Sequence, residues 1–169
     1  MRGKHKGLLI VLAVLALILV AFCLASGKRG PMYGGEGEGY EEVEGGRREF
    51  QLRLRDPGYT YALKGEKTVE ARPNKAPFNV LKAGEAFTVA RSRPQGDTEE
   101  YPGQRRFAAQ VTHVKPYPSI GKLLDAEGLK AYAPGAKDKA AATALFREFT
   151  DEAAEKENGL VAIAFSRPA

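Results

Sequence analysis

The sequence predicts a mixed α+β domain that follows one N-terminal membrane helix. The first observation behind this prediction is an uninterrupted apolar run at residues 8–25, which is long enough to cross a bilayer. The second is the alternation of apolar and polar side chains in several segments after residue 47, which is typical of β-strands. The third is helical spacing of apolar residues in segments among these strands, which places both element types in one domain.

The apolar run from Leu8 to Ala25 contains no charged residue and no polar face, which argues against a helix lying on the membrane surface. At about 1.5 Å per residue such a helix reaches roughly 27 Å, close to the thickness of the hydrocarbon core. We expect residues 1–30 to be a retained single-pass anchor, with cleavage after Ala25 as the alternative. Basic residues are slightly more numerous before the run than after it, which favours the N-terminus inside.

Charge divides the chain into three blocks. Over 169 residues, 26 Lys and Arg against 21 Asp and Glu give a net charge of +5. The charged residues of block 1–30 are all basic, and those of block 31–46 are all glutamates. The charges of these two blocks cancel, so the net positive charge of the chain belongs to residues 47–169. The glycine- and glutamate-rich block 31–46 is predicted to be a flexible acidic linker. The mildly basic block 47–169 is predicted to be the folded domain, and its charge is compatible with RNA binding.

Metal and cofactor sites are not expected in this domain. Cys23 is the single cysteine and lies in the apolar run, so the domain has neither a disulfide nor a cysteine metal site. The two histidines, His5 and His113, are far apart in the sequence, which leaves little scope for a zinc site. We interpret His113 as a packed or rim residue of a strand rather than as a catalyst.

The first half of the domain is predicted to contain three strands and a short helix. Apolar residues at every second position of 50–55 indicate a half-exposed strand. A helical turn over 59–64 precedes Gly65, a residue suited to a helix C-cap. Strands are expected at 67–72 and 86–91, and residues 92–104, rich in proline, glycine and charge, are expected to form a surface loop.

The second half is predicted to contain the longest strand, at 106–114, which two prolines follow. Ser119 suits the N-cap of a helix. Residues 137–155 are predicted to be one helix with Leu145, Phe146 and Phe149 on its apolar face. The almost wholly apolar segment 160–165 is expected to be a buried last strand. About five strands with short helices predict a small, mostly antiparallel β-barrel with flanking helices.

The densest polar cluster of the domain is the octapeptide GEKTVEAR at residues 65–72. In a strand, Glu70 and Arg72 lie on the same face and can form an ion pair, whereas Lys67 lies on the other face. An ordinary solvated strand face is the alternative interpretation of this spacing. Spacing alone does not name a substrate.

The octapeptide resembles the G-x-K-x-x-E-x-R signature of ASCH domains, a family of PUA-like barrels, through Gly65, Lys67, Glu70 and Arg72. The turn at 82–85 and the closing strand at 159–165 are also similar to that family. The resemblance covers roughly residues 49–166. It implies a PUA-like barrel with a cleft beside the signature.

The resemblance implies binding of single-stranded RNA or of a nucleotide in this cleft. Lys67 and Arg72 would contact phosphate, with the planar fork of Arg72 also suited to a base. Glu70 would accept a hydrogen bond from a base amino group or orient Arg72. Asn74 would add a hydrogen-bonding group just beyond the signature.

Some small ASCH proteins are amidohydrolases that remove an acyl group from the exocyclic nitrogen of cytidine. Their resemblance to this chain implies Lys67 as a catalytic candidate, while Glu70 stands at the position of the family's threonine. The family's distant glutamate would correspond to Glu127. Because the threonine is missing, we favour a binding function over catalysis, and a membrane-bound interaction module without catalysis is the third alternative.

Overall fold

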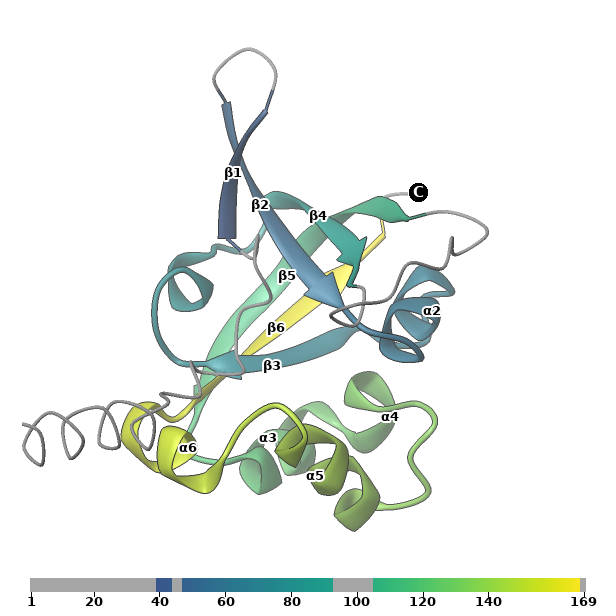
Figure 1. The fold of residues 1–169 in the computed structure, drawn as a ribbon, viewed down its shortest axis with the longest axis vertical. Coiled ribbons are helices and arrows are strands. Elements are labelled where there is room, and N and C mark those ends of the chain that lie inside the picture. The colour runs from purple at the N-terminus through teal and green to yellow at the C-terminus, as the bar shows by residue number, and fades with distance from the viewer. Residues whose placement is uncertain (1–38, 44–46, 93–104, 168–169) are drawn as a thin grey trace, which may run out of the picture. The chain divides into compact units, whose positions relative to one another are not determined.

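The computed structural model describes residues 39–43, 47–92 and 105–167 (Figure 1). In chain order its elements are β1 (Gly39–Val43), β2 (Arg47–Leu54), α2 (Gly58–Leu63), β3 (Val69–Pro73), the 3₁₀ helix η1 (Phe78–Val80), β4 (Ala86–Arg91), β5 (Arg106–Tyr117), α3 (Ile120–Glu127), α4 (Leu129–Tyr132), α5 (Lys139–Arg147), α6 (Glu152–Asn158) and β6 (Leu160–Ser166). The predicted α+β class is confirmed.

The described strands form one six-stranded sheet in the order β1-β2-β4-β5-β6-β3. Only β2 and β4 pair in parallel, and the other neighbours pair antiparallel, as expected for a mostly antiparallel sheet. The strand signals at 50–55, 86–91 and 160–165 all coincide with strands of this sheet. The five expected strands are all present, and the structure adds a sixth, β1, which the sequence did not indicate.

Strand β1 lies in the segment that composition predicts to be a flexible linker. It pairs with β2 through the register Gly39–Gln51 to Val43–Arg47. The ring of Tyr40 packs edge-on against Phe50 at a centroid distance of 5.5 Å. A backbone ladder and one aromatic contact thus order residues whose glycine and glutamate content favours disorder, and the linker expectation does not hold for 39–43.

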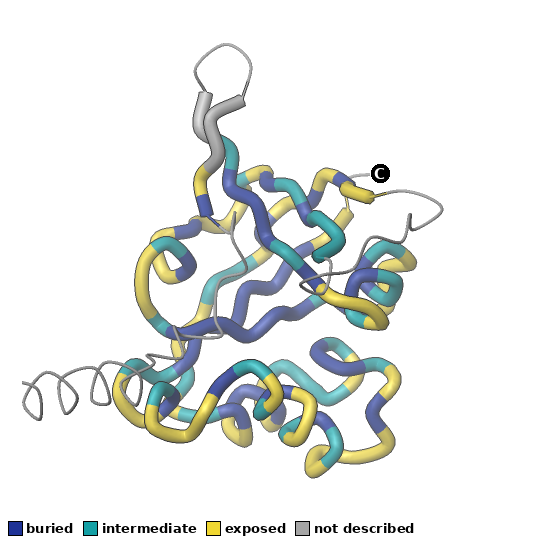
Figure 2. Tube along the Cα trace, in the orientation of Figure 1, coloured by how far each residue is buried: buried dark blue, intermediate teal, exposed yellow. Residues whose placement is uncertain are grey.

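Strand β6 is buried on both faces, which accounts for its apolar sequence. Val161, Ile163 and Phe165 join the core cluster formed with β2, β4 and β5. Leu160, Ala162 and Ala164 alternate to the opposite face and join a second cluster with α3, α4 and α5. Figure 2 shows the equally buried strand β3 alongside it, with which it pairs antiparallel. A strand packed between two apolar layers has no solvent-exposed face, so its sequence lacks the alternation of apolar and polar residues.

The predicted single helix at 137–155 is wrong, because the chain forms α5 and α6 with a break between them. Asp151 caps α6, and its carboxylate accepts a hydrogen bond from the amide of Ala154 at 2.7 Å. Leu145 is exposed, whereas its neighbour Phe146 is 1% exposed and packs against the sheet. An aspartate that competes for backbone amides starts a new helix rather than continuing the old one.

Strand β5 extends past its predicted end at 114 to Tyr117. From Gln110 onward it pairs with β6, and its pairing with β4 ends at the same residue. Pro116 therefore costs no ladder bond on the unpaired side. Ser119 caps α3 as predicted, with its hydroxyl accepting from the amide of Lys122 at 3.3 Å.

Among the described residues, none of the helices has the length and apolar character needed to cross a bilayer. The predicted membrane segment at 8–25 and most of the predicted loop at 92–104 lie outside these residues.

Candidate functional site

Lys67, Glu70 and Arg72 lie together at β3, one of the two edge strands of the described sheet. Their exposed fractions are 5%, 7% and 8%. The Glu70 carboxylate is shared: Oε2 lies 3.2 Å from Nζ of Lys67, and Oε1 forms an ion pair with Nη1 of Arg72. The predicted ion pair is confirmed, and the solvated strand face is excluded because all three side chains are buried.

The two faces of β3 meet different surroundings. Val69 and Ala71 pack into the cluster beneath the helices, so Glu70 and Arg72 alternate to the opposite face. Lys67 precedes the first residue of the strand, and the strict alternation does not apply to it. The amide of Thr68 donates to the carbonyl of Ala131 at 2.9 Å, which fixes the entry into β3 against α4.

Helix α4 holds the amine of Lys67. Its Nζ donates to the backbone carbonyl of Tyr132 and lies 4.2 Å from the centroid of the Tyr132 ring, a cation–π distance. Burial lowers the pKa of Lys67, and the neighbouring Glu70 opposes this effect. Burial alone would raise the pKa of Glu70, but the two cations beside it hold that pKa below its ordinary range.

Arg72 joins two strands that are not neighbours in the sheet. Nη2 donates to the carbonyl of Arg53 on β2 at 2.9 Å, and Nη1 donates to the carbonyl of Ala71 at 3.1 Å. The guanidinium also lies 5.8 Å from the ring centroid of Phe78. Because β3 and β2 are not adjacent in the sheet order, the sheet must curl to bring β3 near β2. The Arg72 side chain then bridges the distance between the two strands.

The other predicted contributors do not join this cluster through any contact described here. Asn74 is half-buried, and its backbone amide donates to the carbonyl of Gly159 at 3.2 Å; its role in ligand binding stays a prediction. Glu127 lies in a separate cluster at the end of α3.

That second polar cluster consists of His113, Tyr117 and Glu127. The Tyr117 hydroxyl donates to Oε1 of Glu127 at 2.6 Å, and Nε2 of His113 lies 2.9 Å from Oε2. The Glu127 side chain is 7% exposed and that of His113 is 34% exposed. The partial exposure of His113 agrees with the expected packed or rim residue, but its partner Glu127 was not expected, because nothing local in the sequence indicates a partner fourteen residues away.

Strand register relates the two clusters. His113 is opposite Ala164 on β6, and Ala164 is opposite Val69 on β3. The three residues therefore form one row across the sheet on the face that carries the helices. Residues 128–132 connect the clusters, because α4 begins after Glu127 and ends at Tyr132, which contacts Lys67.

The hydrogen bond in this second cluster predicts a loss of stability at high pH. Burial and the bond to Glu127 raise the pKa of Tyr117 from its ordinary value of 10.0 to about 12. The folded chain then retains the proton more strongly than the unfolded chain, so this contribution is complete below pH 10 and is lost as the pH rises to about 12. In urea unfolding across this window, the stability advantage of the wild type over Tyr117→Phe should shrink. A constant difference would contradict the hydrogen bond.

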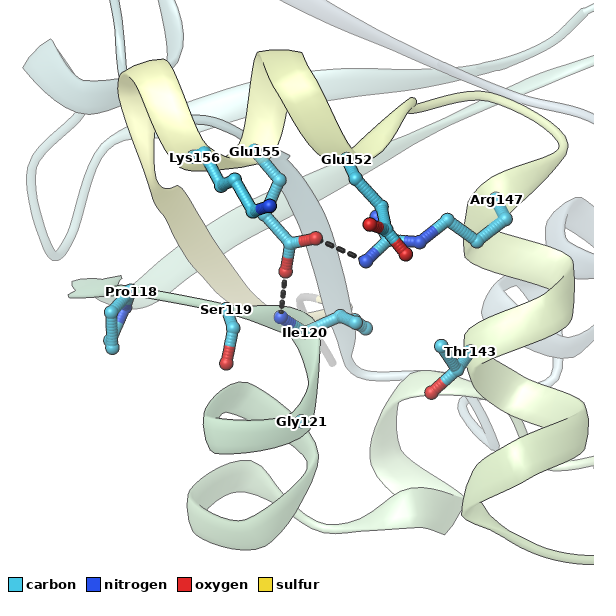
Figure 3. Close-up of a pocket in the computed structure, with 9 residues that line it drawn as sticks. All are labelled: Pro118, Ser119, Ile120, Gly121, Thr143, Arg147, Glu152, Glu155 and Lys156. Atoms are coloured by element: carbon cyan, nitrogen blue, oxygen red, sulfur yellow. Dashed lines mark hydrogen bonds and ion pairs between the residues drawn. The ribbon is translucent and has the colours of Figure 1, made fainter.

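A cavity of about 350 Å³ lies elsewhere, between the start of α3 and helices α5 and α6 (Figure 3). Glu155 fills its polar side: one carboxylate oxygen accepts from the amide of Ile120, and the other pairs with Arg147. None of the nine residues that line it belongs to the signature. This cavity is therefore not the cleft that the resemblance implies.

Comparisons with known proteins bear on the fold. No protein-family model and no curated protein matches the chain. The crystal structure of the hypothetical archaeal protein PH0355 aligns with a TM-score of 0.56 and 23% identity, covering 70% of this chain and 97% of that one. The solution structure of protein PF0455 from Pyrococcus furiosus aligns with a TM-score of 0.52 and 24% identity, covering 70% and 96%. The chain has the fold of these proteins.

Proposed function

We propose that this chain carries an ASCH-type, PUA-like domain that binds RNA or a nucleotide beside the Lys67–Glu70–Arg72 cluster. The observation that carries the proposal is the burial of two cations around one carboxylate at a sheet edge. Apolar residues in such positions are often as stabilising as a buried ion pair or more so. Buried charges whose pKa values are shifted from their ordinary ranges mark a candidate site for recognition or catalysis.

The geometry also limits the kind of contact. Because the three side chains are 5–8% exposed, a ligand reaches only their outer edges. This favours a single base or a terminal phosphate at the cluster over a long stretch of backbone. The cluster carries one positive charge in excess, which suits a phosphate group.

A titration of the full chain, solubilised in a nonionic detergent, with labelled single-stranded RNA tests the proposal. We expect binding at low salt that weakens as salt rises, because phosphate binding releases counterions. Absence of binding at low salt to both the RNA and a free nucleotide would refute the proposal.

A second function is supported by the environment of Lys67. Its burial lowers its pKa and so increases the neutral fraction of the amine, as a lysine that takes part in amide hydrolysis requires. We therefore keep the amidohydrolase of acylated cytidine as the alternative, with Glu70 in place of the family's threonine. Incubation of the full chain with acylated cytidine tests it: deacylation that Lys67→Met abolishes would support it, and an unchanged rate in that variant would count against it.

The proposal includes a membrane tether formed by Leu8 to Ala25. Binding of cellular RNA requires the domain to face the cytoplasm, whereas the small excess of basic residues before the segment favours the opposite side. Protease treatment of intact cells separates the two topologies. A protected domain supports the RNA function, and a digested domain would replace it with an extracytoplasmic interaction module.

A further inference from the structure

Five arginines lie at or next to the ends of strands β2, β4, β5 and β6, and two of them contact α2. Strand register places them there: Arg91 at the end of β4 is opposite Leu54, and Arg106 at the start of β5 is opposite Ala90. The amide of Arg91 donates to the carbonyl of Arg105 at 2.8 Å. We call Arg55, Arg91, Arg105, Arg106 and Arg167 the arginine rim.

The last two members extend the rim around α2. Arg55 follows the end of β2, and Arg167 follows the end of β6. Nη1 of Arg167 donates to the carbonyl of Leu63, the last residue of α2. Four strand ends and one helix end thus contribute to a single basic surface.

The surface has a large local surplus of positive charge. Apart from Arg91, the rim arginines are exposed, and Lys64 adds a further exposed cation at the end of α2. Acids near the rim among the described residues include Asp56, which pairs with Arg91 at 2.8 Å, Glu66, and Glu148 next to the Phe149 ring. The six cations outnumber these acids, so the rim keeps a surplus of positive charge.

Aromatic rings hold several of these guanidinium groups in place. Arg55 lies 5.1 Å from the ring centroid of Phe149, and Arg167 lies 5.4 Å from that of Phe107. Stacking a guanidinium on a ring leaves the N–H groups at its edge directed outward, where they match the two oxygens of a phosphate. An ordered arginine also loses less conformational entropy on binding than a free side chain.

The rim borders the proposed ligand site at both ends of the signature. The carbonyl of Tyr61 in α2 accepts hydrogen bonds from the amides of Glu66 and Lys67, at 2.9 and 3.2 Å. At the other end of the signature, Arg72 binds the carbonyl of Arg53, two residues before Arg55. An RNA strand whose terminal base or phosphate reaches Lys67 would therefore have the rest of its sugar–phosphate backbone near these arginines.

We propose that the arginine rim is the docking surface for the phosphate backbone of a single-stranded RNA whose end enters the Lys67–Glu70–Arg72 cluster. This inference rests on the proposed function. It adds to the base-sized site a surface along which the backbone of the RNA lies. RNA fits better than a lipid surface, because the exposed large apolar residues of the described part, Tyr40, Val80 and Leu145, lie outside the rim. A protein face that inserts into lipid generally presents such residues next to its basic ones.

The test compares two double substitutions in the full chain, solubilised in a nonionic detergent. Arg105→Gln with Arg106→Gln removes two exposed cations of the rim. Lys75→Gln with Lys82→Gln removes two exposed cations from connections outside the rim and is the matched control. The probe is a labelled single-stranded RNA of about 10 nucleotides, in the range of common single-strand binding sites, titrated between roughly 50 and 200 mM salt.

We expect the rim variant to bind more weakly and its salt dependence to be shallower by about 0.7 per lost phosphate contact, or about 1.4 if both arginines contact phosphates. The control variant should bind like the wild type. RNA binding with equal losses in both variants, or none in either, would overturn the rim while leaving the proposed function intact. Absence of RNA binding in the wild type would overturn both.

A second arm of the experiment distinguishes lipid from RNA. The same variants are titrated with mixed micelles that contain phosphatidylserine in place of RNA. If the rim variant loses affinity for these micelles and the wild type does not bind RNA, the rim is a lipid-binding surface and the inference is wrong. RNA binding that depends on the rim, with micelle binding the same in both variants, supports it.

Discussion

Replacing Glu70 by glutamine should lower the free energy of unfolding by about 3–5 kcal/mol, the usual cost of removing one partner from a buried ion pair. Glu70 is 7% exposed and separates the cations of Lys67 and Arg72. Without the carboxylate, two buried positive charges face each other across a neutral amide. Urea unfolding of the full chain in detergent, compared with the wild type, measures this loss.

Asp125→Asn is the matched control for this experiment. Asp125 pairs with Lys139, but both side chains are more than half exposed, at 53% and 59%. Water screens such a pair, so its loss should leave the stability almost unchanged. If Glu70→Gln were as mild as this control, the cluster would not be a buried charge centre.

The dependence of the free energy of unfolding on acidic pH tests the role of Glu70 independently. The pKa of Glu70 is held below its ordinary value of 4.5. The unfolded chain therefore takes up a proton at a higher pH than the folded chain, and the stabilisation present above pH 4.5 is lost as the pH falls. The wild type should lose its advantage over Glu70→Gln in acid, and a difference that grows there would contradict this assignment.

Replacing Lys67 by methionine should lower RNA affinity tenfold or more, because a hydrogen bond to a charged group contributes about 1.5–3 kcal/mol. The fold should tolerate this change better than the loss of Glu70. Methionine fills the space of the lysine stem, and the remaining Glu70–Arg72 pair is neutral. Filter binding with single-stranded RNA, in conditions where unfolding shows the variant to be folded, measures the effect.

Arg147→Met is the control for that measurement. Arg147 pairs with the buried Glu155 beside the cavity of Figure 3, away from the signature. Its loss should reduce stability and leave RNA affinity unchanged. Equal affinity losses in the two variants would mean that binding follows stability in general and has no special link to Lys67.

Local signals in the sequence predicted much of the sheet. Three elements are indicated by residues within them or next to them: β3 by the octapeptide, β6 by the apolar run 160–165, and α3 by Ser119. Alternation, burial on both faces and helix capping each depend on only a few neighbouring residues. The Glu70–Arg72 ion pair also followed from spacing two apart on one strand face.

The missed features depend on partners distant in the sequence. Strand β1 is ordered by pairing with β2 and by the Tyr40–Phe50 contact, and composition carries no information about either. The burial of Lys67 is due to Tyr132, sixty-five residues later. His113 likewise meets Glu127 only because α3 folds back along β5. Spacing within one strand can place two charges side by side, but the elements that cover them determine whether water reaches them.

Hydrogen exchange of the wild-type chain, with and without single-stranded RNA, tests the central claim most directly, because it needs no substitution that alters the fold. The claim is that the ligand meets the chain at the start of β3. We predict slower exchange on binding at the amides of Lys67 and Thr68 and in α4, because the Thr68 amide donates to the carbonyl of Ala131 and Nζ of Lys67 donates to that of Tyr132. Protection confined to other parts of the chain, such as the cavity between α3 and α6, would contradict the claim.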